Sequence, residues 1–346
     1  MRAWQVQRHG SPVDALTMAD VEPPEPGEGQ LRVHVHTTVL NQNEVDGCEG
    51  RYLTVNPPLP YTLGMEVVGI VDATGPGLEA WLERRVMACA VGAFGGHAEY
   101  AIVDPDMTFD VPASLDDVQA AAFFFPFHLA WLTLFERGRL EAGEWLLVHA
   151  GAGGIGSAAV QLGVAAGARV IATAGGPEKV AFCSSLGAEL VIDSRAGDFV
   201  PAVLDATDGR GVDVVCDLVG GDTTVRTFRV NATGARHVLA GFSGGIEAED
   251  DASLVPRPLL FGNFSLCGIM LSYRADPLLV RRASGVNCLP RSLGDRVHEE
   301  VVARLDAGAI RPLVGHVASW HELPEQLERM RERKTMGRTV IDWRAD

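Results

Sequence analysis

Residues 145–179 read WLLVHAGAGGIGSAAVQLGVAAGARVIATAGGPEK, and this stretch decides the fold. The apolar run 145–148 predicts a buried strand, and a turn that matches G-x-G-x-x-G from Gly151 follows it. Apolar residues from Ile155 to Ala166 then recur at helical spacing, and Gly167 is placed to end that helix. A second apolar run over 169–173 completes a strand, helix, strand unit.

The glycine-rich turn is the first candidate binding site. Glycines there let a pyrophosphate approach backbone amides at the positive end of the helix. Close packing at a strand-to-helix crossing would also select small residues, but the strand, helix and second strand at the right distances favour a dinucleotide. The candidate cofactor residues in the turn are Gly153, Gly154, Ile155 and Gly156, and further candidates after later strands are Gly220, Gly241 and Phe242.

The end of the second strand predicts which dinucleotide binds. An NAD site usually carries Asp or Glu about 20 residues after the first glycine, to hold the ribose hydroxyls. That region here is Thr173 to Gly176, which contains no carboxylate. Lys179 lies one turn into the next predicted helix, and Ser194 with Arg195 ends the third predicted strand nearby. Because a positive charge near a missing acid suits a 2′-phosphate, we predict NADPH; the alternative is that Lys179 is only a surface lysine.

The rhythm of the chain changes near residue 125. Short β-like runs at 31–40, 65–73, 85–92 and 97–103, broken by Pro and Gly, predict a mostly antiparallel β domain. Strand-like runs then alternate with helical segments, at 145–149, 169–173, 190–193, 212–218 and 236–240, which predicts a parallel sheet. We expect 263–271 to extend that sheet at its edge and 336–343 to form a closing strand. The fold class is therefore α/β, with two domains.

Composition excludes several classes of function. The 346 residues carry a formal net charge of −16, which disfavours nucleic acid or an anionic membrane as a partner. The longest apolar run, 121–135, is short for a transmembrane helix and contains Pro126 and His128, so we expect a cytoplasmic protein. Six cysteines without a C-x-x-C pair indicate neither a disulfide framework nor a zinc knuckle.

The glycine stretch, with LGAELVID (186–193), GVDVVCDLVGG (211–221) and the terminal GRTVI, resembles the medium-chain dehydrogenase/reductase superfamily, in its zinc-independent quinone oxidoreductase branch. The resemblance covers essentially the whole chain. It implies a GroES-like catalytic domain formed by 1–124 and 272–346, and a doubly wound Rossmann domain over 125–271 that binds NADPH. Relatives commonly dimerise through the edge of the Rossmann sheet, so we expect a homodimer through 263–271.

The resemblance also implies that no metal is bound. Zinc-dependent members carry a G-H-E motif and an early Cys, whereas this chain has LGMEVVG, with Met65 at the His position and Asn41 near the Cys position. A thioether and an amide are poor replacements for imidazole and thiolate on zinc. The lobe of four cysteines that holds a structural zinc is also absent from the sequence.

Zinc-free relatives carry N-P-x-D and then R-x-G-x-Y near the nicotinamide, and the matching stretch here is NQNEVDGCEGRY (41–52). Asn41 and Tyr52 match, Gln42 and Glu44 depart, and Asp46 stands where relatives often have an aromatic residue. In further departures, Leu129 and Ser194 replace a Thr and a Tyr of some relatives. We predict that Asn41 and Tyr52 hydrogen-bond the developing oxyanion; the alternatives are a turn residue and a packing residue.

These features predict an NADPH-dependent oxidoreductase that transfers hydride to a quinone-like acceptor. Two alternatives remain, a reductase of activated double bonds in enones, alkenals or enoyl thioesters, and a non-catalytic NADPH-binding sensor. A thioester substrate would suit a basic cleft mouth, for which the candidates are Arg51, Arg257, Arg274, Arg281 and Arg282. The aromatic cluster 123–131 could line a pocket for a flat apolar acceptor. We favour the alternative that most of it packs in the hydrophobic core.

Overall fold

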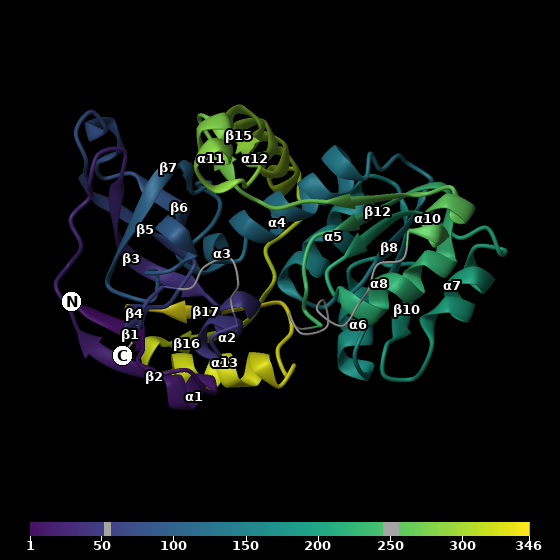
Figure 1. Ribbon diagram of the computed structural model, residues 1–346, viewed down its shortest axis with the longest axis horizontal. Coiled ribbons are helices and arrows are strands. Elements are labelled where there is room, and N and C mark those ends of the chain that lie inside the picture. Colours follow the sequence, from purple (N-terminus) through teal and green to yellow (C-terminus); the bar gives the residue numbers. More distant parts are fainter. Residues whose placement is uncertain (52–56, 245–255, 346) are drawn as a thin grey trace. The chain divides into compact units, whose positions relative to one another are not determined.

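The structure is a computed structural model that describes residues 1–51, 57–244 and 256–345 (Figure 1). The chain divides into two compact units. The first comprises Met1–Phe124, Ser272–Leu293 and Pro312–Asp346, and the second comprises Phe125–Leu271 and Gly294–Arg311.

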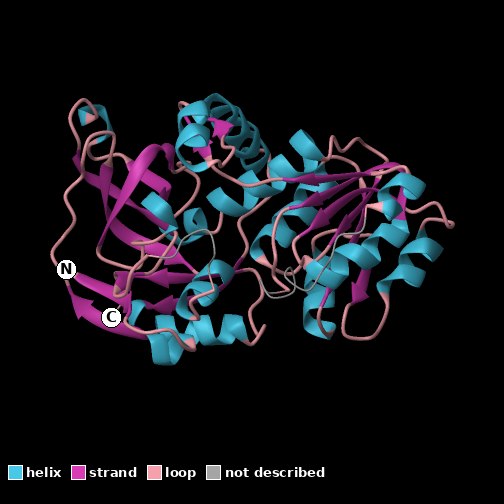
Figure 2. Ribbon diagram, in the orientation of Figure 1, coloured by secondary structure: helices cyan, strands magenta, loops and turns pink. Residues whose placement is uncertain are grey.

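The second unit is built on a parallel sheet with helices on both sides, as expected for a Rossmann domain (Figure 2). Its strand order is β10-β9-β8-β11-β12-β13, so the order reverses between β8 and β11. The strands are β8 (Trp145–Val148), β9 (Arg169–Ala174), β10 (Leu190–Asp193), β11 (Val212–Asp217), β12 (Asn231–Leu239) and β13 (Ser265–Gly268). Their helices are α5 (Gly154–Ala165), α6 (Pro177–Ser185), α7 (Phe199–Ala206), α8 (Gly221–Thr227) and α10 (Arg257–Gly262).

Apolar side chains on the strands and on α7 hold this sheet together. Leu147, Ile171 and Val215 come from three neighbouring strands and are fully buried in one cluster with Val200 and Val203 of α7. Burying side chains of this size removes apolar surface from water, worth about 1.5–3 kcal/mol for each. The expected edge strand is confirmed by the parallel pairing of β13 with β12, although it is shorter than 263–271.

One segment belongs to a different unit from the one we expected. Residues 294–311 fall in the second unit, whereas we expected them in the catalytic domain. The physical reason is the helix α12 (Arg291–Asp306), which packs on α4 (Phe124–Trp131). His298 Nδ1 lies 3.2 Å from His128 Nε2, and the Arg304 guanidinium lies 4.4 Å from the centre of the Trp131 ring.

The first unit is a closed, largely antiparallel sheet, in keeping with a GroES-like domain. Its strand order is β16-β17-β3-β5-β6-β7, and β3 also pairs with β7. The strands are β3 (Leu31–Val39), β5 (Glu66–Thr74), β6 (Arg85–Ala90), β7 (Tyr100–Asp110), β16 (Val314–Ser319) and β17 (Arg338–Asp342). The predicted closing strand is therefore confirmed, and Val340 of β17 lies opposite Val39 of β3.

Smaller elements complete the first unit. A second sheet has the order β2-β1-β4, and β14 pairs with β15. The strands are β1 (Arg2–Val6), β2 (Leu16–Asp20), β4 (Tyr61–Thr62), β14 (Tyr273–Arg274) and β15 (Leu289–Pro290). The helices are α1 (Pro12–Ala15), α2 (Gln42–Cys48), α3 (Asp117–Ala121), α11 (Pro277–Ser284) and α13 (Leu323–Arg331).

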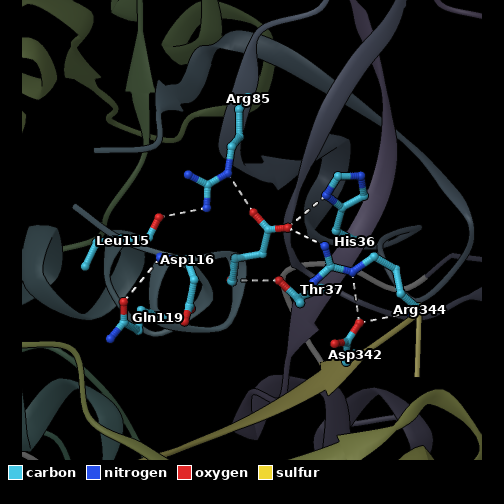
Figure 3. Close-up of polar contacts among 9 residues, drawn as sticks. His36, Thr37, Arg85, Leu115, Asp116, Gln119, Asp342 and Arg344 are labelled. Carbon is cyan, nitrogen blue, oxygen red and sulfur yellow. Dashed lines mark hydrogen bonds and ion pairs between the residues drawn. The ribbon is translucent and has the colours of Figure 1, made fainter. Parts of the chain in front are cut away.

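A charged cluster around Asp117 ties the C-terminal tail to this unit (Figure 3). Arg85 Nε donates to one carboxylate oxygen of Asp117 at 2.7 Å, and Arg344 Nη1 donates to the other at 2.8 Å, where His36 Nδ1 also lies at 2.9 Å. Burial alone would raise the pKa of Asp117, but the hydrogen bonds from Arg85 and His36 outweigh it and lower the pKa. The cluster is structural, because its groups bond one another.

The aromatic cluster lies in the interior, as we favoured. Phe123, Phe124, Phe127 and Trp131 are buried, and Phe125 is half-buried. They belong to a helical stretch, Asp117–Arg137, which is longer than the apolar run we expected and passes a test of length and composition for a membrane span. Protein covers 78% of its most apolar window, as in the core helix of a globular domain.

Candidate active site

The glycine-rich turn connects β8 to α5 and requires at least one of its glycines. A Cβ on Gly156 would lie 2.2 Å from the carbonyl oxygen of Ala150, whose backbone is itself left-handed at φ 54°. Gly151 is also tightly packed, because its Cβ would lie 3.0 Å from that of Ala172. Gly153 is exposed, and Gly154 and Ile155 are half-buried at the start of α5. Backbone amides at this helix start therefore remain accessible to an anion.

Thr173 holds the glycine-rich turn through a backbone hydrogen bond. Its carbonyl oxygen accepts a hydrogen bond from Gly151 N at 2.9 Å, and its buried hydroxyl lies 3.0 Å from His149 Nδ1. The other ring nitrogen of His149 lies 2.8 Å from the Thr227 hydroxyl. Burial lowers the pKa of His149 to about 4, so the ring is neutral near pH 7. The Thr173 side chain is thus engaged inside the protein, and a contact between Thr173 and a cofactor stays a prediction.

The loops after β9 and β10 meet beside the basic residue Arg195 and the acidic residue Asp193. A Cβ on Gly175 would lie 3.2 Å from Arg195 Nε and 3.7 Å from Ser194 Oγ, and one on Gly176 would lie 3.3 Å from Arg195 Nη1. The exposed guanidinium of Arg195 therefore covers the two glycines that stand in place of an acidic residue. Lys179 is half-buried one turn into α6. Burial raises the pKa of the Cys183 thiol to about 11, and the charge of Lys179 opposes part of that rise.

Asp193 fixes the shape of this place. Its Oδ1 accepts hydrogen bonds from the backbone amides of Gly176 and Arg195, both at 2.9 Å. These bonds lower the pKa of the Asp193 carboxyl, which holds the turn after β10 against the start of α6. Asp193 was not predicted from the sequence. Arg195 was placed with Ser194 at the end of the third strand, near the predicted 2′-phosphate, but not among the candidate binding residues.

Three further candidate residues lie together after β11 and β12. A Cβ on Gly220, whose φ is 78°, would lie 3.6 Å from Phe242 Cα and 3.7 Å from the Gly241 carbonyl oxygen. The two loops are joined by hydrogen bonds from Ser243 N to Leu218 O and from Gly244 N to Val219 O, both at 2.9 Å. The Phe242 side chain is half exposed. All the candidate cofactor residues thus follow the carboxyl ends of the parallel strands, where such sheets bind ligands.

The buried acid Asp217 shapes the loop that carries Gly220. One carboxylate oxygen accepts from Val219 N and Gly220 N at 3.0 and 3.1 Å. The other accepts from the Thr224 hydroxyl at 2.5 Å and lies 3.1 Å from His237 Nε2. Burial would raise the pKa of Asp217, but the hydrogen bond from His237 and the charges around it lower the pKa strongly.

In the first unit, Asn41 begins α2 and is buried. Its Oδ1 accepts from Arg338 Nη1 at 3.1 Å, and its Nδ2 donates to Val39 O at 3.3 Å. Arg338 also bonds Glu66, where burial raises the pKa of the carboxyl and Arg338 and Asn41 oppose that shift by charge and hydrogen bonding. The amide of Asn41 is therefore engaged by protein groups, which favours a positioning role. Its contact with an oxyanion stays a prediction.

Glu44, the acid that departs from the relatives' pattern, connects three parts of the chain. Its Oε2 accepts from Asn41 N and lies 3.1 Å from His97 Nε2, and its Oε1 accepts from Met65 N at 2.9 Å. His97 Nδ1 in turn lies 2.8 Å from the Thr38 hydroxyl. This buried network fixes the start of α2 relative to β5.

The positions that hold zinc in metal-dependent members do not fit a zinc ion. The Asn41 oxygen faces Arg338, a fixed cation, and the Met65 sulfur lies 3.6 Å from Asn43 Nδ2. Over the ranges that the structure describes, no three His, Cys, Asp or Glu side chains gather as a metal site would require. Tyr52, the second predicted catalytic residue, lies outside the described residues. Arg51 and Asp46 precede it and are described.

Comparison with known proteins agrees with this geometry. Residues 27–113 match the family model of the alcohol dehydrogenase GroES-like domain, and residues 154–281 match that of the zinc-binding dehydrogenase. Quinone oxidoreductase of Rattus norvegicus is 31% identical over 271 residues, which are 78% of this chain and 80% of the relative. The chain belongs to the medium-chain dehydrogenase/reductase superfamily, in its zinc-independent quinone oxidoreductase branch.

Two further similarities extend over most of the chain. A polyketide synthase subunit of Mycobacterium tuberculosis, named for phenolphthiocerol and phthiocerol, is 31% identical over 95% of this chain, which spans 14% of that protein. A mycobacterial protein solved in complex with NADPH has a TM-score of 0.83 and 26% identity, with 99% of each chain covered. The family, the fold and these similarities support an oxidoreductase that uses a nicotinamide cofactor.

Proposed function

We propose that this member of the superfamily is an NADPH-dependent reductase that transfers hydride to a quinone-like acceptor. The observation that carries the cofactor preference is the position of the Arg195 guanidinium, which lies where side chains at positions 175 and 176 would reach. Where an NAD site needs a carboxylate, this chain presents a guanidinium, the Ser194 hydroxyl and, one turn into α6, Lys179. Guanidinium and ammonium groups suit a 2′-phosphate dianion. The Asp193 carboxylate beside them accepts hydrogen bonds from the backbone amides of Gly176 and Arg195.

The remaining candidate residues suit the rest of a dinucleotide. The start of α5 presents amides to the pyrophosphate, with Gly156 leaving room for the turn that aims them. Gly220, Gly241 and Phe242 gather beyond β11 and β12, at the other side of the strand-order reversal. The nicotinamide, when bound, supplies the hydride, and the chain supplies orientation and polar contacts.

The quinone preference follows from the similarity to quinone oxidoreductases. The same hydride chemistry would reduce an activated carbon–carbon double bond, and the similarity to a polyketide synthase subunit over 95% of the chain keeps that alternative open. A non-catalytic sensor remains the third outcome, since Gln42 and Leu129 depart from the relatives' pattern.

An acceptor panel tests the proposal. Purified protein is given NADPH and either a simple quinone or an enone of similar size, and NADPH consumption is followed. The matched control is Gly156→Val, which fills the turn before α5 and so removes cofactor binding. Faster consumption with the quinone, absent from the control, supports the proposal. Faster consumption with the enone selects double-bond reduction, and tight NADPH binding without turnover selects the sensor.

We also propose that the protein is a homodimer that pairs through β13. Among the described strands, β13 pairs only with β12, which leaves its other edge to a partner. Leu260 and Phe261, on the helix just before it, are 73% and 76% exposed. Exposed apolar side chains beside an unpaired edge fit a second copy of the same sheet.

A further inference from the structure

Asp46 is buried, and one of its carboxylate oxygens has no hydrogen bond from the residues that the structure describes. It lies on α2 and is only 4% exposed, and its Oδ1 has no hydrogen-bond partner within the described part of the chain. Arg51 Nη2 is 3.5 Å from that oxygen, which is ion-pair distance but long for a hydrogen bond. Buried polar atoms are nearly always satisfied, so an exception points to a ligand or a chemical role.

The charges around Asp46 favour a bound proton. Arg51 forms its closer ion pair with Glu49, and Arg331 of α13 bonds Glu49 at 2.7 Å and Glu328 at 2.8 Å. Two guanidinium groups thus serve three carboxyl groups, of which Asp46 is the least well held. Burial raises the pKa of Asp46, Arg51 opposes the shift, and Glu49 adds to it, so the pKa lies above its ordinary value.

If Asn41 holds the developing oxyanion as predicted, the acceptor lies at the start of α2, and the proposed reaction needs a proton donor on that helix. Hydride addition to an enone or a quinone leaves an anion on oxygen that must take up a proton. The side-chain amide of Asn41, at the start of the same helix, is engaged by Val39 and Glu66 and has no acidic proton to give. Asp46 follows five residues later, about 7.5 Å along the helix axis.

Resting on the proposed function, we propose that Asp46 is the proton donor of the reduction. Its carboxyl O–H bonds the carbonyl oxygen of the acceptor. A bound nicotinamide would supply the hydride that forms a C–H bond at the β-carbon of an enone, and the electron pair of the double bond would move to give the enolate. The Asp46 O–H bond then breaks, its proton goes to the enolate, and solvent returns a proton to the carboxylate. The acceptor gains two electrons and the nicotinamide loses two.

The experiment compares Asp46→Asn with wild type on two kinds of acceptor. Asparagine keeps a hydrogen-bond donor but cannot release a proton, so kcat should fall while KM for the acceptor changes little. With an enone or quinone we expect kcat to fall at least about 100-fold, the range of general acid catalysis. With an N-methylphenazinium cation, which becomes neutral on taking hydride and forms no anion, we expect a change of less than about threefold.

The pH profile gives a readout that packing does not move. Wild-type kcat should decline as the pH rises through the raised pKa of Asp46, because only the protonated carboxyl acts, and Asp46→Asn should lose that limb. Asp46→Glu should restore part of the activity. The charged groups that act on Asp46 are Arg51 and Glu49. Glu49 is in turn bonded by Arg331 of α13, which also bonds Glu328. Glu49→Gln therefore serves as the control for a disturbed charge network and should retain the pH limb.

The outcomes separate this inference from the function on which it rests. Turnover of both acceptors by wild type, with Asp46→Asn impaired only on the enone or quinone, supports the proton donor. Equal loss on both acceptors, a drop in thermal stability without the pH change, or no loss at all overturns it and leaves the reductase intact. A wild-type protein that reduces neither acceptor refutes both proposals.

Discussion

Arg338 Nη1 donates to Asn41 Oδ1 at 3.1 Å across 297 positions of sequence, at the place where zinc-dependent relatives bind their metal. The contact joins the last strand of the chain to the first helix after β3, and Arg338 also bonds the buried Glu66. The buried guanidinium of Arg338 therefore helps to hold the start of α2, and removing it should lower the free energy of unfolding.

Replacing Arg338 by methionine should strongly destabilise the first unit. Glu66 would remain buried without its counter-charge, and breaking a buried pair in this way costs about 3–5 kcal/mol of unfolding free energy. Denaturant titration measures that free energy. Arg329→Met, at an exposed position on α13, is the control and should change it by less than about 0.5 kcal/mol. Equal stability of the two variants would show that the pair contributes nothing.

Replacing Arg195 by alanine should weaken NADPH binding and leave NADH binding nearly unchanged. Removing one charged hydrogen bond to the 2′-phosphate costs about 1.5–3 kcal/mol, which is roughly a 10- to 150-fold rise in Kd. Titration calorimetry with each cofactor measures both affinities. The control is Arg229→Ala, an arginine whose side chain is 66% exposed elsewhere in the same unit. If Arg195→Ala weakens NADH binding just as much, Arg195 does not read the phosphate.

His149 should make stability depend on pH. Because burial lowers its pKa in the folded state to about 4 from 6.5, the unfolded chain takes up a proton in that range and the folded chain does not. The stabilisation is therefore complete above about pH 6.5 and is lost as the pH falls toward 4, by about 3 kcal/mol. Denaturant titrations of wild type and His149→Gln at several pH values measure it. A difference between them that is constant with pH would contradict this account.

The exposed side chains before β13 should be needed for dimerisation. Changing Leu260 and Phe261 to serine removes apolar surface but leaves the strand itself intact, so the fold should be kept while the dimer weakens. Light scattering over a range of protein concentrations measures the mass. The double variant Leu278→Ser and Leu279→Ser, also exposed but on α11, is the control. A monomeric wild type, or a double serine variant at 260 and 261 that is as dimeric as the wild type, would exclude this interface.

How much the sequence predicted depended on how local each feature is. The turn before α5 was predictable because glycine spacing and helix periodicity lie within a few residues of one another. The assignment of 294–311 to the second unit was not predictable, because it depends on the contact between His128 and His298. No local sequence pattern indicates that contact. Arg and Asp are residue types that usually lie on the surface. Only the folded structure shows that Arg195 covers two glycines and that Asp46 is buried. Arg338, which bonds the Asn41 side chain, lies near the other end of the sequence, so no local pattern could predict this contact.

The most direct test of the central claim is the initial rate of NADPH oxidation by purified protein with a quinone, set against the rate with NADH at equal concentration. The account predicts quinone-dependent oxidation that is faster with NADPH, a preference that Arg195→Ala abolishes, and no oxidation by Gly156→Val. Equal rates with the two cofactors, or NADPH oxidation that is unchanged in Gly156→Val, would contradict it.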